Sequence, residues 1–170
     1  MYWTDKHVLC CTASHCAQKG ANDVVMQLRR EVLRRGLDGR IFVNTCGTID
    51  LCDVGPNIVV YPDGVVYSGV AKGDIKELVD ALAAGETVER LVLGPDTAAE
   101  RARRDLYAAA TDPEPTRPAV DVETLVAERG FDAAWIAEQA RRGFVARKPG
   151  ADGGPETITV TKKARDRYGV

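Results

Sequence analysis

The sequence predicts an α/β protein, in which a mixed sheet with flanking helices is followed by a small α+β module. Short apolar segments typical of strands alternate with segments of helical periodicity over the first half of the chain. An Asp-Gly pair separates two β-branched runs at residues 58–61 and 65–67, which is a strong hairpin signal. After Leu93 the composition changes, and alanine, arginine and proline become frequent.

The elements of the first part can be placed in order. Residues 7–11 form a short apolar strand, and residues 22–35 form a helix that ends at Gly36. Residues 40–44 form a second strand, and the hairpin follows. Asp74 as N-cap with Glu77 three residues later resembles a capping box, and it opens a helix that ends near Gly85. Strands alternating with helices in this order predict a mixed sheet covered by helices.

The remainder predicts a linker and a second unit. Residues 96–110 are expected to form a solvated helix, and three prolines between residues 112 and 118 exclude a regular helix or a central strand. From residue 120 onward we expect two short helices, a hairpin with strands at 144–147 and 157–160, and a closing helix. The predicted domains are therefore residues 1–93, a helix and Pro-rich linker at 94–118, and a C-terminal module at 119–170.

Size and composition limit the possible classes of protein. The chain has 170 residues, of which 45% are hydrophobic and 28% are charged, as in ordinary globular proteins. A net charge of -2 does not indicate a dedicated nucleic-acid-binding or membrane protein. The N-terminus lacks the basic-then-apolar order of a secretion signal, and no apolar run could span a bilayer. We therefore expect a cytoplasmic protein, in which cysteines serve metal or redox chemistry more often than disulfides.

Cysteine placement carries most of the functional information. The five cysteines fall into two groups, Cys10, Cys11 and Cys16 in the first and Cys46 and Cys52 in the second. Two chain segments can bring their thiols to one point, and four thiolates at one point bind zinc or an iron–sulfur cluster.

The sequence around these cysteines resembles a known family. The stretch from Cys52 to Val70, CDVGPNIVVYPDGVVYSGV, together with residues 7–9, 15–20 and 85–91, is similar to the thioredoxin-like [2Fe-2S] ferredoxins over residues 5–93. The thioredoxin-like subunit of respiratory complex I is a more distant relative. The resemblance implies a thioredoxin-like fold, a homodimer and one [2Fe-2S] cluster per subunit. It also implies an electron carrier, rather than an enzyme, that exchanges single electrons with a reductase or oxidase.

The resemblance also implies a set of ligands, carried over as Cys11, Cys16, Cys46 and Cys52. Five residues separate the last two cysteines, where the family usually has three. Cys10 adjoins Cys11, but alternation along a strand turns Cys10 to the opposite side, where it packs as a small apolar residue. Pro56, just before a strand, is a candidate for the cis proline that is frequent in thioredoxin-like folds.

Three alternatives stay open at the cysteines. Structural zinc sites favour tighter C-x-x-C spacing than either group has. A thiol–disulfide oxidoreductase requires C-x-x-C at a helix start, which the sequence lacks. His15, next to Cys16, could replace a thiolate as in Rieske centres, although four thiols already suffice.

The C-terminal module gives a second functional hypothesis. Its hairpin is similar to the wing of a winged-helix domain, and basic residues outnumber acidic ones after Gly130. The alternative is therefore a redox-sensing regulator whose cluster domain controls a nucleic-acid- or protein-binding module. The expected recognition helix at 131–142 is short and carries Asp132 and Glu138, which makes nucleic acid the less favoured partner. A docking module with a basic face that suits an acidic partner is the simpler interpretation.

Overall fold

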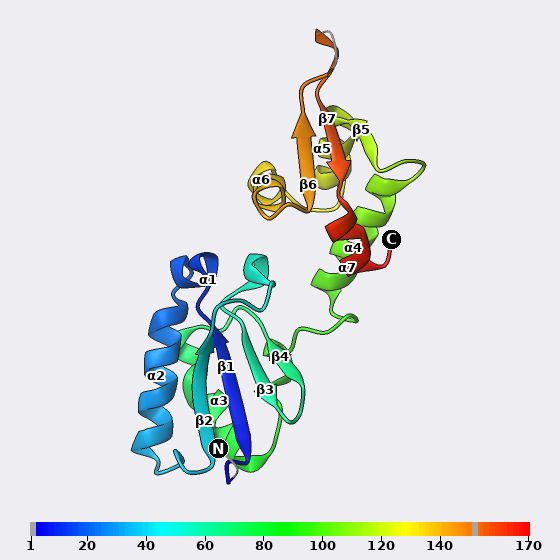
Figure 1. The fold of residues 1–170 in the computed structure, drawn as a ribbon. Helices are drawn as coiled ribbons and strands as arrows, with labels where there is room; N and C mark the ends of the chain where they lie inside the picture. The colour runs from blue at the N-terminus through cyan, green and yellow to red at the C-terminus, as the bar shows by residue number, and fades with distance from the viewer. Residues whose placement is uncertain (1–2, 151–152) are drawn as a thin grey trace. The chain divides into compact units, whose positions relative to one another are not determined.

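The computed structural model describes residues 3–150 and 153–170, with only the backbone of Cys52. The chain divides into two compact units, Met1–Gly94 and Pro95–Val170 (Figure 1). Among the helices described in these ranges, none has both the length and the hydropathy needed to cross a bilayer.

The first unit is built on a four-stranded mixed sheet, as predicted. Its strands are β1 (Lys6–Cys11), β2 (Ile41–Cys46), β3 (Ile58–Tyr61) and β4 (Val65–Tyr67), in the spatial order β2-β1-β3-β4. Strands β1 and β2 are parallel, whereas the β1–β3 and β3–β4 pairs are antiparallel. The Asp-Gly signal therefore marked the β3–β4 hairpin correctly.

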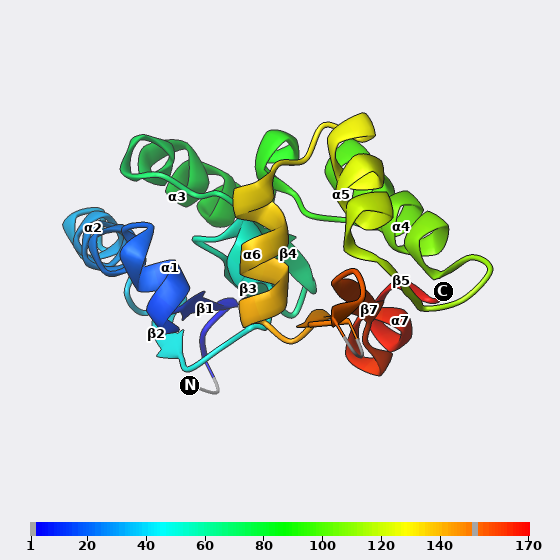
Figure 2. The same cartoon turned by 90° about the horizontal axis from the view of Figure 1, so that it is seen from above.

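Two helices cover one face of this sheet. They are α2 (Ala21–Arg34) and α3 (Ile75–Ala84), which pack against each other on the same side of the strands (Figure 2). Val8, Cys10 and Ile41 project from the sheet into a core that Leu28 of α2 and Leu78 of α3 also fill. Burial of this apolar stripe, rather than local propensity, holds both helices in place.

No helix among the described residues of this unit covers the opposite face of the sheet. Alternation along the strands brings Leu9, Phe42, Val59 and Tyr61 to that face. Phe42 is 37% exposed and Tyr61 is 50% exposed. Because an uncovered sheet face is normally polar, apolar residues here indicate a surface suited to a partner.

The expected capping box at α3 is not formed. A 3-10 turn, η2 (Lys72–Asp74), precedes the helix, and the Asp74 side chain accepts a hydrogen bond from the Ala71 N–H at 2.7 Å rather than from the helix. Arg90 forms ion pairs with both Asp74, at 2.7 Å, and Glu77. Glu77 is thus drawn to an arginine instead of to the N-cap backbone.

The second unit contains four helices and a three-stranded antiparallel sheet within its described residues. The helices are α4 (Ala98–Thr111), α5 (Ala119–Glu128), α6 (Ala133–Arg141) and α7 (Lys162–Tyr168). The strands are β5 (Thr116–Pro118), β6 (Val145–Lys148) and β7 (Thr157–Val160), in the order β5-β7-β6. Tyr107 lies at the centre of the core, where it stacks on Tyr168 at 4.7 Å between ring centroids.

The prediction of a linker at residues 94–118 is wrong. Helix α4 buries Leu106, Tyr107 and Ala110 in the core of the second unit, so it is not a solvated helix. Residues 116–118 form strand β5, which pairs with β7 at an edge of the sheet. Proline is compatible with an edge strand because the missing N–H can face away from the ladder. The prolines therefore mark a bend within the second unit.

Candidate metal centre

Three cysteines of the first unit meet at one edge of the sheet. Cys11 ends β1 and Cys46 ends β2, and the two are register partners. Because the strands are parallel, their carboxyl ends lie at the same edge. A five-residue helix, α1 (Ser14–Gln18), follows β1 and carries Cys16. Cys11, Cys16 and Cys46 then pack with Ala21 in a small cluster separate from the main core.

The three thiols differ in exposure. Cys11 and Cys16 are fully buried, whereas Cys46 is partly exposed. Burial raises the pKa of the Cys46 thiol, and the neighbouring Cys11 raises it further. A positively charged metal centre would reverse this effect, because coordinated thiols lose their protons. Two of the three thiols are therefore shielded from solvent, and the third is partly open to it.

Hydrogen bonds fix the segments that carry the thiols. The Thr12 N–H and hydroxyl both donate to the Cys46 carbonyl, at 3.0 and 3.1 Å, which ties the turn after β1 to the end of β2. The Cys11 N–H donates to the carbonyl of Asn57 at 2.9 Å. The Asn57 side-chain amide donates to the carbonyl of Leu51 at 2.5 Å. Asn57 is 1% exposed and thus anchors both cysteine segments from inside the unit.

The loop between Cys46 and β3 has a defined shape. Asp50 adopts a left-handed backbone conformation with φ of 58°, which aspartate tolerates better than most residues. The backbone of Cys52 begins the 3-10 turn η1 (Cys52–Val54), and its side chain lies outside the described part of the chain. The Val54 carbonyl accepts a hydrogen bond from the Gly69 N–H at 2.8 Å. The Gly55–Pro56 peptide is cis, as expected.

Cys10 lies on the opposite side of the strand from Cys11. It is 2% exposed and belongs to the main core with Val8 and Leu28. Burial raises the pKa of the Cys10 thiol to about 12, with smaller contributions from Cys46 and Cys11, while Arg29 lowers it. Cys10 is a poor candidate ligand because its side chain lies in the main core, on the other side of the strand from the cluster of Cys11, Cys16 and Cys46.

The two histidines are placed apart from one another. His15 lies on α1 and is partly exposed, next to Cys16 in the sequence. His7 lies at the other end of β1, on the helix-free face, with its ring 5.3 Å from that of Phe42. In the described part of the chain, no three His, Cys, Asp or Glu side chains are gathered tightly enough to hold a single metal ion.

Sequence reasoning missed Asn57 and Thr12, which position the cysteines without being metal-binding residue types. A polar residue directly before the apolar run of β3 was the available signal for Asn57.

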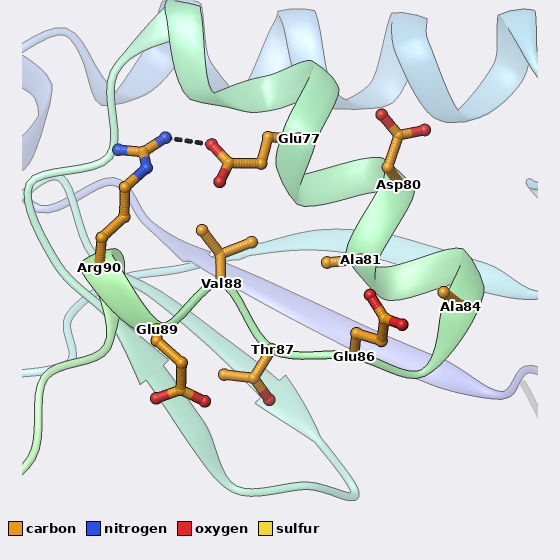
Figure 3. A pocket seen from close by; sticks show the side chains of 9 residues that line it. All are labelled: Glu77, Asp80, Ala81, Ala84, Glu86, Thr87, Val88, Glu89 and Arg90. Atoms are coloured by element: carbon orange, nitrogen blue, oxygen red, sulfur yellow. Dashed lines mark hydrogen bonds and ion pairs between the residues drawn. The ribbon is translucent and has the colours of Figure 1, made fainter.

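Away from the thiols, a cavity of about 520 Å³ lies between α3 and residues 86–90 (Figure 3). Four of its nine lining residues carry carboxylates, and the guanidinium group of Arg90 reaches across to Glu77. Its described lining includes neither cysteine nor histidine.

Taken with the fold, these thiols define a class of protein: a thioredoxin-like unit with cysteines clustered at one edge of its sheet. No family model matches the chain. Two ferredoxins described as "2Fe-2S" do match it. One, from Clostridium pasteurianum, is 33% identical over 94 residues, which cover 50% of this chain and 92% of that protein. The other, from Aquifex aeolicus (strain VF5), is 36% identical over 101 residues, which cover 52% and 88%.

A solved structure agrees with these sequence relatives. The crystal structure of the thioredoxin-like [2Fe-2S] ferredoxin from Aquifex aeolicus matches with a TM-score of 0.51 and 34% identity, over 54% of this chain and 98% of that one. The chain belongs to the thioredoxin-like [2Fe-2S] ferredoxin family, and about half of its length lies beyond the match.

Proposed function

We propose that this protein is a soluble, cytoplasmic [2Fe-2S] ferredoxin that transfers single electrons between redox partner proteins, and that it is not an enzyme. The observation that carries the proposal is the meeting of Cys11, Cys16 and Cys46 at one sheet edge, beside the backbone of Cys52. Membership of the ferredoxin family supports it.

Cys11, Cys16, Cys46 and Cys52 are the proposed ligands of the cluster. The donor set fits, because four thiolates from two chain segments are what a [2Fe-2S] cluster requires. A bound cluster supplies a centre that accepts and releases one electron. The residues of this chain hold it and limit its exposure: Cys11 and Cys16 are buried, and Ala13 and Ile49 pack beside them. The partly exposed Cys46 marks the side from which a reductase or oxidase would approach.

The test is the metal content of the purified protein together with its spectrum. The proposal predicts a brown protein with equal amounts of iron and acid-labile sulfide, whose visible absorption bleaches with dithionite. An EPR signal should appear on reduction. A colourless protein with stoichiometric zinc would reject the proposal in favour of a structural zinc site.

A homodimer is part of the proposal. The helix-free sheet face supports it, because Phe42 and Tyr61 would bury apolar area against a second copy. Cys11 and Cys46 lie on this same face at the edge of the sheet, since they continue the alternation of Leu9 and Asn44.

A redox-sensing regulator is the second candidate. The order helix, strand, helix, helix and hairpin in the second unit favours it, because winged-helix domains share this order. Helix α6 would then be the recognition helix, but its exposed residues include Ala133, Ala134 and Ala137, and alanine offers DNA bases no hydrogen bond. A gel shift on genomic DNA at low salt tests this candidate, and no shift at any salt concentration would eliminate DNA binding.

A further inference from the structure

The side chain of Lys19 joins two of the segments that carry the proposed cluster ligands. Its ammonium group donates a hydrogen bond to the carbonyl of Asp53 at 2.6 Å. Lys19 ends α1, the helix that carries Cys16, and Asp53 lies in the turn η1 directly after Cys52. The bond therefore connects the segments of two different proposed ligands, across 34 positions of the sequence.

The backbone holds Lys19 in a fixed position relative to Cys16. The Lys19 N–H donates to the carbonyls of His15 and Cys16, at 3.2 and 3.1 Å, and so closes the C-terminal end of α1. Gly20 follows with φ of 90°, a left-handed conformation that suits glycine, and α2 then begins at Ala21. Ala21 packs in the same small cluster as Cys16. The base of the Lys19 side chain is therefore fixed close to the thiols.

Hydrogen bonding, rather than packing, directs the rest of this side chain. Lys19 is exposed, and it lines a cavity of about 320 Å³ together with Gly55, Pro56 and Val70. Open space thus lies beside its stem. A hydrogen bond with a charged donor, such as the one to Asp53, is roughly twice as strong as one between neutral groups. Loss of the ammonium group should therefore release η1 from α1 without leaving a hole in the core.

The charge of Lys19 also suits its surroundings. Residues 46–57 include Asp50 and Asp53 but no lysine or arginine, and residues 10–18 include no lysine or arginine either. Four cysteine thiolates would add negative charge between these two segments, and reduction of a cluster adds one more negative charge. The net charge at an iron–sulfur cluster is one of the factors that set its reduction potential. An ammonium group tied to η1 therefore favours the reduced state.

We propose that Lys19 is a positioning residue for the [2Fe-2S] cluster. Its ammonium group keeps the Cys16 and Cys52 segments together and raises the reduction potential of the cluster. This inference rests on the proposed function, because it requires that the cluster binds. The role differs from that of Asn57, whose neutral side-chain amide fixes the backbone and brings no charge.

The first test compares midpoint reduction potentials, measured by reductive titration of the visible absorption. K19M removes the ammonium group but keeps an apolar stem, so its potential should be lower than that of the unmodified protein. K19R keeps the charge, and its potential should stay close to the unmodified value. K72M is the matched control, because Lys72 lines the same cavity but pairs with Asp23 of α2 at 3.1 Å. Its potential should be unchanged.

The second test includes a measurement that needs no cluster. In the iron-free protein, the Val54 N–H donates to the Leu51 carbonyl within η1 at 3.1 Å. Its hydrogen exchange, followed by NMR, should be faster in K19M, because η1 is no longer tied to α1, and unchanged in K72M. In the iron-loaded protein, a chelator should remove iron from K19M roughly tenfold faster, as expected for a residue that supports metal ligands.

Two results would overturn the proposal. Equal potentials of K19M and the unmodified protein would do so even with faster exchange, because Lys19 would then have a structural role only. Unchanged exchange of the Val54 N–H in K19M would also do so, because η1 would not depend on the bond from Lys19. An unmodified protein that binds no iron would reject the electron-transfer proposal and this inference together, so the two kinds of failure are distinguishable.

Discussion

Cys11 and Cys46 are register partners at the carboxyl ends of the parallel strands β1 and β2. Adjacent strands in a sheet lie roughly 4.8 Å apart, so the pairing brings together two thiols that are far apart in the sequence. Cys16 joins them because α1 begins directly after the turn. The site thus depends on the register of one strand pair.

Serine substitutions should distinguish the cysteines that bind the cluster from Cys10, which does not. C11S, C16S, C46S and C52S should each lose most of the bound iron and visible absorption, because a hydroxyl is a much weaker ligand for iron than a thiolate. C10S should keep the full iron content but lose about 1–3 kcal/mol of stability, since it buries a hydroxyl. Iron analysis would measure the cluster content of each variant, and urea unfolding would measure its stability. An iron-free C10S protein with an iron-loaded C11S protein would reverse the assignment.

Removing the Asn57 side chain should loosen the site without removing a ligand. N57A loses the hydrogen bond to the Leu51 carbonyl and leaves that partly buried carbonyl without this donor, at a cost of about 1–3 kcal/mol. The variant should assemble the cluster but lose it faster in the presence of a chelator, as the decay of visible absorption would report. N44A, at an exposed position, is the control and should decay like the unmodified protein.

Cys10 should make the folded chain sensitive to alkaline pH. Burial raises the pKa of its thiol from 9.0 to about 12, so the unfolded chain loses this proton first as the pH rises. The stabilisation from the neutral buried thiol is complete below pH 9.0 and is lost progressively toward pH 12. Unfolding free energies of the unmodified and C10A proteins should therefore converge with rising pH. Burial also raises the pKa of Tyr67, but this effect is common to both proteins.

The ion pairs of Arg90 should contribute modestly at neutral pH. Partial burial raises the pKa of Asp74, but the Ala71 N–H and Arg90 outweigh this effect and the net shift is downward. Stability from this carboxylate is present above pH 3.8 and is lost as the pH falls below it. R90Q should destabilise the protein only slightly near pH 7, because solvent screens these exposed ion pairs. The difference from the unmodified protein should shrink in acid, whereas R30Q should change little at either pH.

Charge on the helix-free sheet face should disrupt the proposed dimer. F42E/Y61E places two carboxylates where a second copy would bury apolar rings, and light scattering should then report a monomer. M26E lies on the exposed side of α2 and should leave the assembly unchanged. A dimer that survives F42E/Y61E would show that another surface forms the interface.

Local patterns predicted most of the elements. The strand at residues 7–11, the Asp-Gly hairpin and the helix that begins near residue 22 differ from the structure by one or two residues. Helix α1 was missed because its five residues are too few to show a helical period. The linker was wrong because prolines exclude central strands but allow edge strands such as β5.

The site was only partly predictable for a different reason. Residue type alone identified the candidate thiols, and strand alternation separated Cys10 from Cys11. The second strand was expected to end at residue 44, but it continues to Cys46. The pairing of Cys46 with Cys11 joins residues distant in the sequence, and register of this kind is set by the burial of a whole sheet face. No local pattern around Cys46 contains that information.

The two adjacent cysteine side chains of β1 point to opposite faces of the sheet. The one that is buried among the helices can therefore report how often the first unit opens. A thiol-reactive dye can reach the sulfur at position 10 only when the sheet and its helices come apart, because that side chain is 2% exposed. The rate of labelling at this position, read by peptide mapping, would then measure how often the whole first unit opens, with no engineered tag.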